Sequence, residues 1–142
     1  MSHIPVSLLE VREHNEPNYK PLIDYQSWRV ALINFAGELS PEKINRMQKH
    51  TGTDEVFVLL AGRCILFLGE GDNAVTKVHA VDMEFYKLYN VKRSVWHSHT
   101  LSKNAKVLIV ENRDTADDNS PFMDLTTDQR RQMIDQTRQL WK

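Results

Sequence analysis

Two short apolar runs separated by a tight turn constrain this chain more than any other feature of its sequence. The first run is residues 55–60 (EVFVLL), the second is residues 64–68 (CILFL), and residues 61–63 (AGR) lie between them. Each run has only five or six residues, which is too short for an ordinary helix but suits a buried strand. The segment therefore predicts two paired β-strands joined by a tight turn.

Similar strand-like segments recur through the middle of the chain. Residues 28–35, 75–81, 85–91 and 106–111 are rich in aliphatic, β-branched and aromatic side chains, and polar or glycine-containing stretches separate them. Short strands at this spacing, with no helical pattern between them, are typical of an antiparallel sandwich or barrel. We expect the core of this barrel to occupy about residues 28–111.

The composition changes after residue 111. Residues 112–121 are polar and predict a solvated linker. Thr126, followed three residues later by Gln129, resembles the capping box that begins a helix. Side chains then fall on one face at helical spacing: Met133, Ile134, Thr137, Leu140 and Trp141. We therefore expect a helix over about residues 127–141, packed on the barrel or on a partner subunit.

Length, charge and cysteine content set further limits. A chain of 142 residues with 41% hydrophobic side chains has the size and usage of one globular domain, which we expect to span residues 1–142. The net charge of −1 provides no basic field for nucleic acid or an anionic membrane. No segment approaches the ~20 apolar residues of a membrane span, and no secretion signal is evident, so we expect a cytoplasmic protein. Cys64, the single cysteine, excludes an internal disulfide and suits a buried strand position.

Three of the six histidines lie at the edges of strand-like segments. His50 precedes the first apolar run, whereas His97 and His99 are two residues apart and would face the same side of a strand. Strands of a barrel bring such residues, distant in sequence, to one pocket, as a metal site requires. In the alternative interpretation His50 caps a loop, Glu55 pairs with a basic side chain, and the other two histidines are hydrogen-bonded to the backbone.

Two segments of the sequence resemble the cupin superfamily. His50, Glu55 and Gly62 have the spacing of the first cupin motif, in which two histidines alternate, a glutamate follows and a glycine closes a turn. Residues 93–97 (RSVWH) resemble the second motif, which supplies one more histidine, and the two motifs together cover residues 46–110. The resemblance implies an all-β fold, an antiparallel double-stranded β-helix or jelly-roll barrel, which the C-terminal α-helix would follow here.

The resemblance also implies a set of metal ligands. Metal-binding cupins use the motif histidines and the glutamate, which assigns His50, Glu55 and His97 to a divalent ion such as Zn, Fe, Mn or Ni. Gln48 occupies the position of the first histidine. The site would then bind metal through three strong ligands and water, use His99 as a fourth ligand, or have lost the metal. Glu55 is also the candidate catalytic residue, because it would either complete the ligand set or move a proton.

A narrower resemblance is to ureidoglycolate lyase, a cupin-like enzyme of purine nitrogen catabolism. It depends on residues 47–50 (MQKH) and 90–97 (NVKRSVWH), where that family has Met-Glu-Arg-His and a segment ending in Arg-Gly-Val-Trp-His. Within the second segment, Arg93 is a candidate for binding a substrate carboxylate. Tyr89, which directly precedes this segment, is a candidate for placing a hydroxyl in the pocket. A solvated turn and a side chain that merely fills the barrel are the alternatives for these two residues.

Three functions stay open on the sequence. The first is a metal-dependent lyase or isomerase acting on a small hydroxy acid, keto acid or sugar derivative. The second is a non-catalytic module that binds a small-molecule ligand, and the third is a structural protein with a vestigial pocket. The sequence has no phosphate-binding glycine loop, serine nucleophile elbow or cysteine pair, which excludes the enzyme classes that depend on them. We expect a homodimer, because of the apolar helix face and the tendency of cupin-like barrels to pair.

Overall fold

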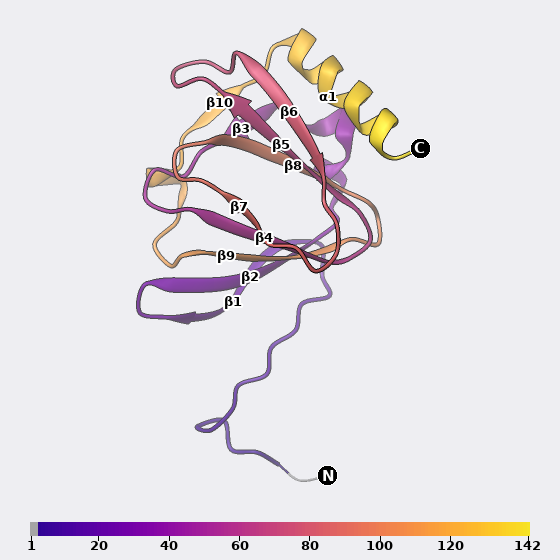
Figure 1. Ribbon diagram of the computed structural model, residues 1–142. Coiled ribbons are helices and arrows are strands. Elements are labelled where there is room, and N and C mark those ends of the chain that lie inside the picture. The colour runs from indigo at the N-terminus through magenta and orange to yellow at the C-terminus, as the bar shows by residue number, and fades with distance from the viewer. Residues whose placement is uncertain (1–2) are drawn as a thin grey trace.

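Two β-sheets stacked face to face make up the body of the protein, and a helix lies on one side of them (Figure 1). The computed structural model describes residues 3–142. The first sheet has the strand order β1-β2-β9-β4-β7 and the second has the order β10-β3-β8-β5-β6. Every strand pairing is antiparallel. The predicted all-β architecture of two antiparallel sheets with a C-terminal helix is therefore confirmed.

The strands are three to eight residues long. Those of the first sheet are β1 (Asn18–Tyr25), β2 (Trp28–Asn34), β4 (Glu55–Ala61), β7 (Tyr89–Val91) and β9 (Lys106–Asn112). Those of the second sheet are β3 (Arg46–Gln48), β5 (Cys64–Glu70), β6 (Lys77–Asp82), β8 (Trp96–Leu101) and β10 (Phe122–Asp124). Short 3-10 helices occur at Gly37–Leu39, Pro41–Lys43 and Asp117–Asn119.

Alternate residues of the strands fill the space between the sheets. Phe57 and Leu59 of β4 are buried against Val107 and Ile109 of β9, whereas their neighbours in sequence face outward. Because successive side chains of a strand point to opposite faces, the apolar runs bury one side only. Cys64 belongs to this interior, as its apolar surroundings in the sequence predict.

Glycine at the turn between β4 and β5 is required by the backbone. Gly62 has a φ of 69°, in the left-handed region that favours glycine. A Cβ atom at this position would lie 2.6 Å from the backbone of Ala105. The turn predicted at residues 61–63 is therefore present. Its backbone path accepts only glycine at position 62.

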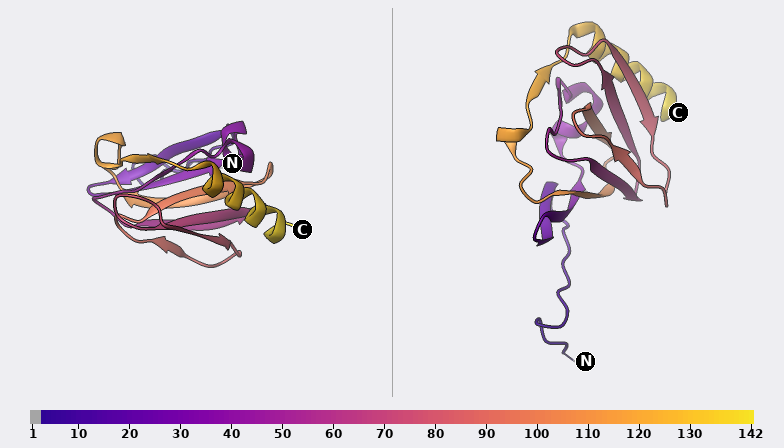
Figure 2. Two further views of the ribbon diagram at one scale, coloured as in Figure 1. Left: turned by 90° about the horizontal axis from the view of Figure 1, so that it is seen from above. Right: turned by 60° about the vertical axis from the view of Figure 1, so that its left-hand side comes forward.

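The helix α1 (Thr127–Leu140) covers the outer face of the second sheet (Figure 2). Met133 of the helix is buried with Phe67 of β5 and Trp96 of β8 in a second apolar cluster. The predicted capping box is present, because the Thr126 side chain accepts from the backbone of Gln129 and the Gln129 side chain accepts from that of Thr126. None of the helices within residues 3–142 is both long and apolar enough to cross a membrane.

The sheets extend beyond the expected range of residues 28–111. β1 precedes that range and β10 follows it. A register shift between Pro21 and Ile23 interrupts the alternation of β1, which hides its strand character in the sequence. Residues 112–121, expected to be a solvated linker, contain a 3-10 helix and the fully buried Ser120. Weakly apolar strands and polar loops gain their order from the tertiary contacts they make.

We expect Met133→Ala to lower the free energy of unfolding by about 2–4 kcal/mol, because it leaves a cavity between α1 and the second sheet. Gln132→Ala, at an exposed position of the same helix, is the matched control and should change it by less than about 0.5 kcal/mol. Urea unfolding followed by circular dichroism measures both values. Equal, small effects of the two substitutions would mean that the fold does not depend on this contact.

Candidate metal centre

Charged residues replace apolar ones at one end of the interior of the first sheet. Arg29 in β2, Glu55 in β4 and Glu111 in β9 occupy the alternate positions that elsewhere along these strands face the core. The register places them side by side, because Arg29 pairs with Glu111 and the adjacent Val56 pairs with Val110. The first sheet thus presents a row of three charges to the interior.

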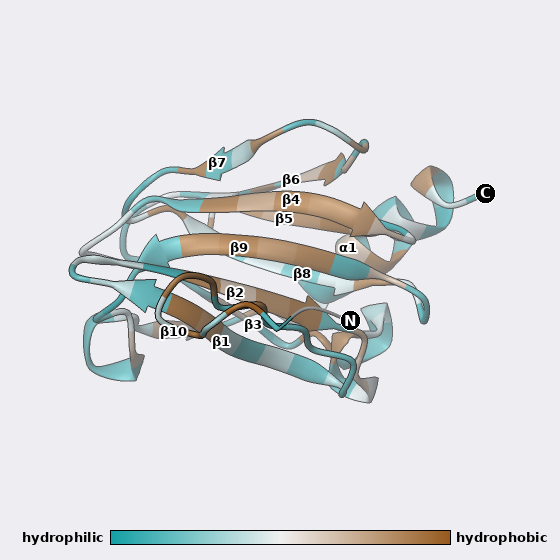
Figure 3. Ribbon diagram, turned by 90° about the horizontal axis from the view of Figure 1, so that it is seen from below, coloured by the Kyte–Doolittle hydropathy of each residue, from teal (hydrophilic) through white to brown (hydrophobic). Residues whose placement is uncertain are grey.

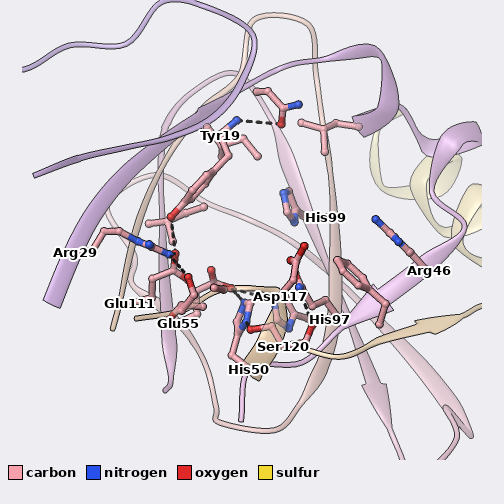
Figure 4. A pocket seen from close by; sticks show the side chains of 18 residues that line it. Tyr19, Arg29, Arg46, His50, Glu55, His97, His99, Glu111, Asp117 and Ser120 are labelled. Carbon is pink, nitrogen blue, oxygen red and sulfur yellow. Dashed lines mark hydrogen bonds and ion pairs between the residues drawn. The ribbon is translucent and has the colours of Figure 1, made fainter. Parts of the chain in front are cut away.

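Imidazole side chains face this row from the second sheet (Figure 4). His97 and His99 lie on β8, two residues apart and on the same side, and His50 follows the end of β3. Gln48 of β3 pairs with His97, so that its side chain faces the same interior. Pairing within the first sheet thus joins Arg29 and Glu111, which are 82 positions apart, and the second sheet places the histidines opposite them.

His50, Glu55 and His97 form a compact buried cluster. Each offers one ligand atom, and these atoms lie within 4.8 Å of one another. Glu55 Oε1 is 3.2 Å from Nε2 of His50 and 3.0 Å from Nε2 of His97. This oxygen is nevertheless buried without a hydrogen-bond partner of acceptable geometry. The structure thus brings together the three residues that the sequence assigned to a metal ion.

The hydrogen bonds of the two Nδ1 atoms, which point away from Glu55, determine the tautomer of each imidazole ring. His97 Nδ1 lies 3.0 Å from the carbonyl oxygen of Val95, which can only accept, so Nδ1 carries the hydrogen. His50 Nδ1 lies 2.7 Å from Ser120 Oγ, whose own hydrogen is donated to Asn119 Oδ1. In the neutral rings the Nε2 lone pairs therefore face Glu55. Such outer hydrogen bonds are typical of metal-binding histidines.

Two of the three separations between the donor atoms suit a divalent ion, and all three atoms lie within 4.8 Å of one another. Metal bonds to imidazole nitrogen and carboxylate oxygen are ~2.0–2.2 Å long, so that two ligands at right angles lie about 3.0 Å apart. The observed separations of 3.0 and 3.2 Å agree with this value. An ion bound here would also satisfy the buried Glu55 Oε1. The cluster can therefore bind a metal ion, and its ligand types do not select one metal among Zn, Fe, Mn and Ni.

Electrostatic interactions keep the Glu55 carboxyl ionised. Burial by itself raises the pKa of Glu55, but the contacts with His50 and His97 outweigh burial and hold the pKa below its ordinary value. Burial lowers the pKa of His97, yet the adjacent Glu55 carboxylate raises it, with a net increase. Without an ion, the raised pKa of His97 favours its protonated form, whose Nε2–H faces the Glu55 carboxylate, and a bound cation would take the place of that proton.

Three hydrogen-bonded side chains of the first sheet, Tyr19, Arg29 and Glu111, lie next to the cluster on the side away from the histidines. The Tyr19 hydroxyl of β1 donates to Glu111 Oε1 at 2.5 Å, and Arg29 donates to the same oxygen at 2.7 Å. Burial raises the pKa of Tyr19, so its hydroxyl stays protonated as a donor. Burial raises the pKa of Glu111, and the neighbouring Glu55 raises it further. These hydrogen bonds hold Glu111, which lies next to Glu55 in the register of β4 and β9.

Tyr19, Arg29, Glu111 and Ser120 were not among the predicted site residues. Glu111 had a detectable signal, because it continues the inward-facing alternation of β9 with a charged side chain in place of an apolar one. Arg29 has the same signal in β2. Tyr19 and Ser120 lie in segments whose order depends on tertiary contacts, and the local sequence contains no comparable signal for them.

Gln48 and His99, the other candidate ligands, line the pocket with different contacts. The Gln48 amide donates to the carbonyl oxygen of Ser120 at 3.0 Å. His99 points into the pocket, and neither of its ring nitrogens has a hydrogen-bond partner. Burial lowers the pKa of His99 to about 4. His99 is not among the residues whose ligand atoms converge, and metal binding by these two residues stays a prediction.

Arg93 and Tyr89, the candidates for substrate binding, make contacts elsewhere. Arg93 is exposed, and its backbone N–H donates to Asp54. The Tyr89 hydroxyl accepts from the backbone N–H of Glu84. Neither residue lines the cavities around the histidines, and their assignment to substrate stays a prediction.

A cavity of about 430 Å³ opens over the cluster, and this volume suits a small molecule. Its polar lining includes the cluster, the hydrogen-bonded group behind it and two side chains nearer the solvent: His50, Glu55, His97, Tyr19, Arg29, Glu111, Arg46 and Asp117. The site is therefore accessible to a ligand as well as to an ion.

Comparison with known proteins identifies the fold. No protein-family model matches the chain, and no curated protein matches its sequence. The structure is similar to Pac13 from Streptomyces, described as a unique nucleoside dehydratase, with a TM-score of 0.54 and 9% identity over 82% of this chain and 87% of that chain.

Two further solved structures share the architecture. Oxalate decarboxylase from Bacillus subtilis matches with a TM-score of 0.50 and 12% identity over 70% of this chain and 24% of that chain. HppE with Fe(II) matches with a TM-score of 0.51 and 16% identity over 66% of this chain and 50% of that chain. Identities this low establish the fold alone, which is a stack of two antiparallel β-sheets shared with these structures.

We expect Zn(II), Mn(II), Fe(II) or Ni(II) to raise the melting temperature of the untagged protein, because an ion that binds only the native state stabilises it. His50→Ala and His97→Ala should each abolish the increase. His79→Ala is the matched control, because His79 is exposed and pairs with Glu70 outside the site. Differential scanning fluorimetry, with metal analysis of the purified protein, measures the effect.

Ser120→Ala tests the outer hydrogen bond while leaving all three ligands in place. It should weaken metal binding by about 10- to 100-fold, as the loss of such partners does in other metal sites.

If the metal still raised the melting temperature of His50→Ala and His97→Ala, the metal site would lie elsewhere.

Proposed function

We propose that this cupin-fold protein is a divalent-metal-dependent lyase acting on a small hydroxy acid or keto acid. The observation that carries the proposal is the position of Glu55 Oε1, which is buried between two imidazole Nε2 atoms without a hydrogen-bond partner. Three protein ligands leave coordination positions open for substrate, as in catalytic metal sites rather than structural ones.

A bound divalent ion would supply Lewis acidity, polarising a carbonyl or hydroxyl oxygen of the substrate. The chain itself holds the ion through His50, Glu55 and His97. Glu55 is the carboxylate nearest to this position and can move a proton as well as act as a ligand. Glu111, held by Tyr19, lies next to Glu55.

The reactions of the structural neighbours support a lyase over an isomerase. Pac13 is described as a dehydratase and another neighbour as a decarboxylase, and both reactions release a small molecule by breaking a bond without hydrolysis. HppE was solved with Fe(II), which supports a metal in this fold. An isomerase acting on a sugar derivative is the alternative within the same chemistry. Ureidoglycolate is a further candidate substrate, on the basis of residues 93–97.

A non-catalytic role in binding a small ligand is the second candidate function. The observation that favours it is His99, whose buried ring nitrogens face the cavity without partners and can bind a ligand without reacting. A metal-dependent turnover assay separates the two functions.

We expect metal-loaded protein to convert at least one member of a panel of hydroxy acids, keto acids and ureidoglycolate, monitored by proton NMR. Chelation should abolish turnover. Glu55→Gln should lower kcat by about 100-fold or more, because it removes the charge and the proton-transfer capacity of this group. Glu70→Gln, at an exposed position, is the matched control. Ligand binding without turnover in the metal-loaded protein would favour the non-catalytic function.

We also propose that the outer face of the first sheet pairs with a second copy of this chain. Two rows of half-buried apolar side chains cross β2, β9 and β4 on this face, and no helix of residues 3–142 lies over them (Figure 3). The rows are Leu32, Leu108 and Val58, and Val30, Val110 and Val56. An exposed apolar patch bounded by polar residues is typical of an interface.

The N-terminal arm supports this choice of partner. Residues 3–13 extend away from the body on the side of the first sheet (Figure 1). Leu8 is 77% exposed, and Val6 and Val11 are each 80% exposed. The root of the arm is anchored, because the side chains of Asn34 and Lys106 donate to the carbonyl oxygen of His14. In a two-fold dimer each arm can cover apolar surface of the other copy.

Light scattering after size exclusion should show a dimer for the wild-type protein at micromolar concentration. Val58→Asp should produce a monomer, because it places a charge in one of the two apolar rows. Ala74→Asp, in the exposed loop between β5 and β6, is the matched control and should stay dimeric. A monomeric wild-type protein, or a dimer unaffected by Val58→Asp, would contradict this interface.

A further inference from the structure

A gap in the second sheet opens beside the candidate metal centre. β3 and β8 pair at one position only, Gln48 with His97. Continuing this antiparallel register would place Arg46 opposite His99, but the two strands form no further pairs. Arg46 and His99 therefore lie on the two sides of an opening between the strands.

Two cavities meet at this opening. One is the 430 Å³ cavity that contains His50, Glu55 and His97, and the other has a volume of about 460 Å³ and extends toward Lys43 and Asp124. Six residues line both cavities: Leu39, Arg46, Gln48, His97, His99 and Phe122. A ligand bound at the metal centre can therefore continue past Arg46 and His99 into the second cavity.

Arg46 is an exposed cation at the cavity wall, without an ion-pair partner among the described residues. Its guanidinium lies 3.7 Å from the centre of the Phe122 ring, and this contact holds the side chain at the cavity wall. Asp124 is its partner in the β3–β10 register, yet within residues 3–142 no carboxylate lies within 4.0 Å of the guanidinium. A guanidinium in this condition can bind a carboxylate or phosphate through two parallel hydrogen bonds.

His99 is a half-buried residue whose two ring nitrogens are buried and have no hydrogen-bond partner within residues 3–142. The ring of Phe57 packs beside it at 5.8 Å between centroids. Native structures rarely keep such atoms unsatisfied, because the desolvation of an unpaired donor or acceptor destabilises the fold. A neutral imidazole has one donor and one acceptor, which together match a hydroxyl group.

We propose that the opening between β3 and β8 binds the far end of the substrate, with a carboxylate or phosphate at Arg46 and a hydroxyl at His99. This inference rests on the proposed function, because it takes the other end of the substrate to be the acid bound at the metal centre. The substrate class is then a hydroxy acid that carries a second, remote anionic group.

Matched acids that differ in the remote group test the proposal. The pairs are malate with 2-hydroxybutyrate, 2-hydroxyglutarate with 2-hydroxyvalerate, and 3-phosphoglycerate with glycerate. Isothermal titration into the Zn(II)-loaded protein and into the metal-free protein measures each affinity. We expect the anionic member of at least one pair to bind about tenfold more tightly, through its charge-assisted hydrogen bonds to Arg46. The third pair distinguishes phosphate from carboxylate.

Two variants assign the effect to the residues. Arg46→Gln should remove the preference for the anionic member and leave the metal-induced increase in melting temperature unchanged. Arg130→Gln, at an exposed position of α1, is the matched control. His99→Leu should weaken both members of a pair by a similar factor of roughly tenfold. It should not lower the melting temperature, because it removes buried polar atoms that have no partner.

Equal affinities within every pair, no binding of any anionic acid, or a preference that survives Arg46→Gln would overturn the proposal. A lower melting temperature with unchanged affinities in His99→Leu would overturn the role of His99. A protein that binds no metal would refute the proposed function separately. The preference that depends on Arg46 would still be measured in the metal-free protein, so the two failures are distinguishable.

Discussion

A buried, ionised carboxylate governs how the polar end of this protein is organised. Glu55 lies on the inner surface of the first sheet, where the transfer of a charge out of water costs several kcal/mol unless partners compensate it. Two imidazoles from the opposite sheet provide that compensation, and a divalent ion would provide it more completely. Glu111 lies beside Glu55 and is held in turn by Tyr19 and Arg29. The position of each of these groups depends on the others.

Apolar packing elsewhere in the fold sets the separation of the two sheets, and this separation allows the histidines to reach Glu55. Away from the charged end, the interior is apolar and closely packed around Phe57 and Val107. The helix α1 covers the outer face of the second sheet through Met133 and supports the strand that carries His97. No helix within residues 3–142 covers the outer face of the first sheet, and the apolar arm extends on the same side. The polar pocket, the face covered by α1 and the uncovered apolar face therefore lie on different parts of the two-sheet body.

Local sequence pattern does not show which arginine lies at the cavity. The second motif drew attention to Arg93, because it directly precedes a segment that contains a candidate ligand. The fold exposes Arg93 to solvent and places Arg46 at the cavity wall instead. The three-residue strand β3 has no recognisable alternation, so the direction of the Arg46 side chain follows from its pairing with β8 and β10. Such pairing is a tertiary property.

The sequence by itself determined the antiparallel strands, the turn at Gly62 and the C-terminal helix, and its resemblance to the cupin motifs singled out His50, Glu55 and His97. Short-range patterns predict these features: apolar alternation, turn residues, helix caps and motif spacing. Only the tertiary structure decided that Glu111 and Tyr19 stand behind the cluster, and that an edge strand and a polar loop complete the pocket. A period of two records which residues share a face of a strand. It does not record which strands become neighbours, because that depends on loop paths and on interactions between distant parts of the chain.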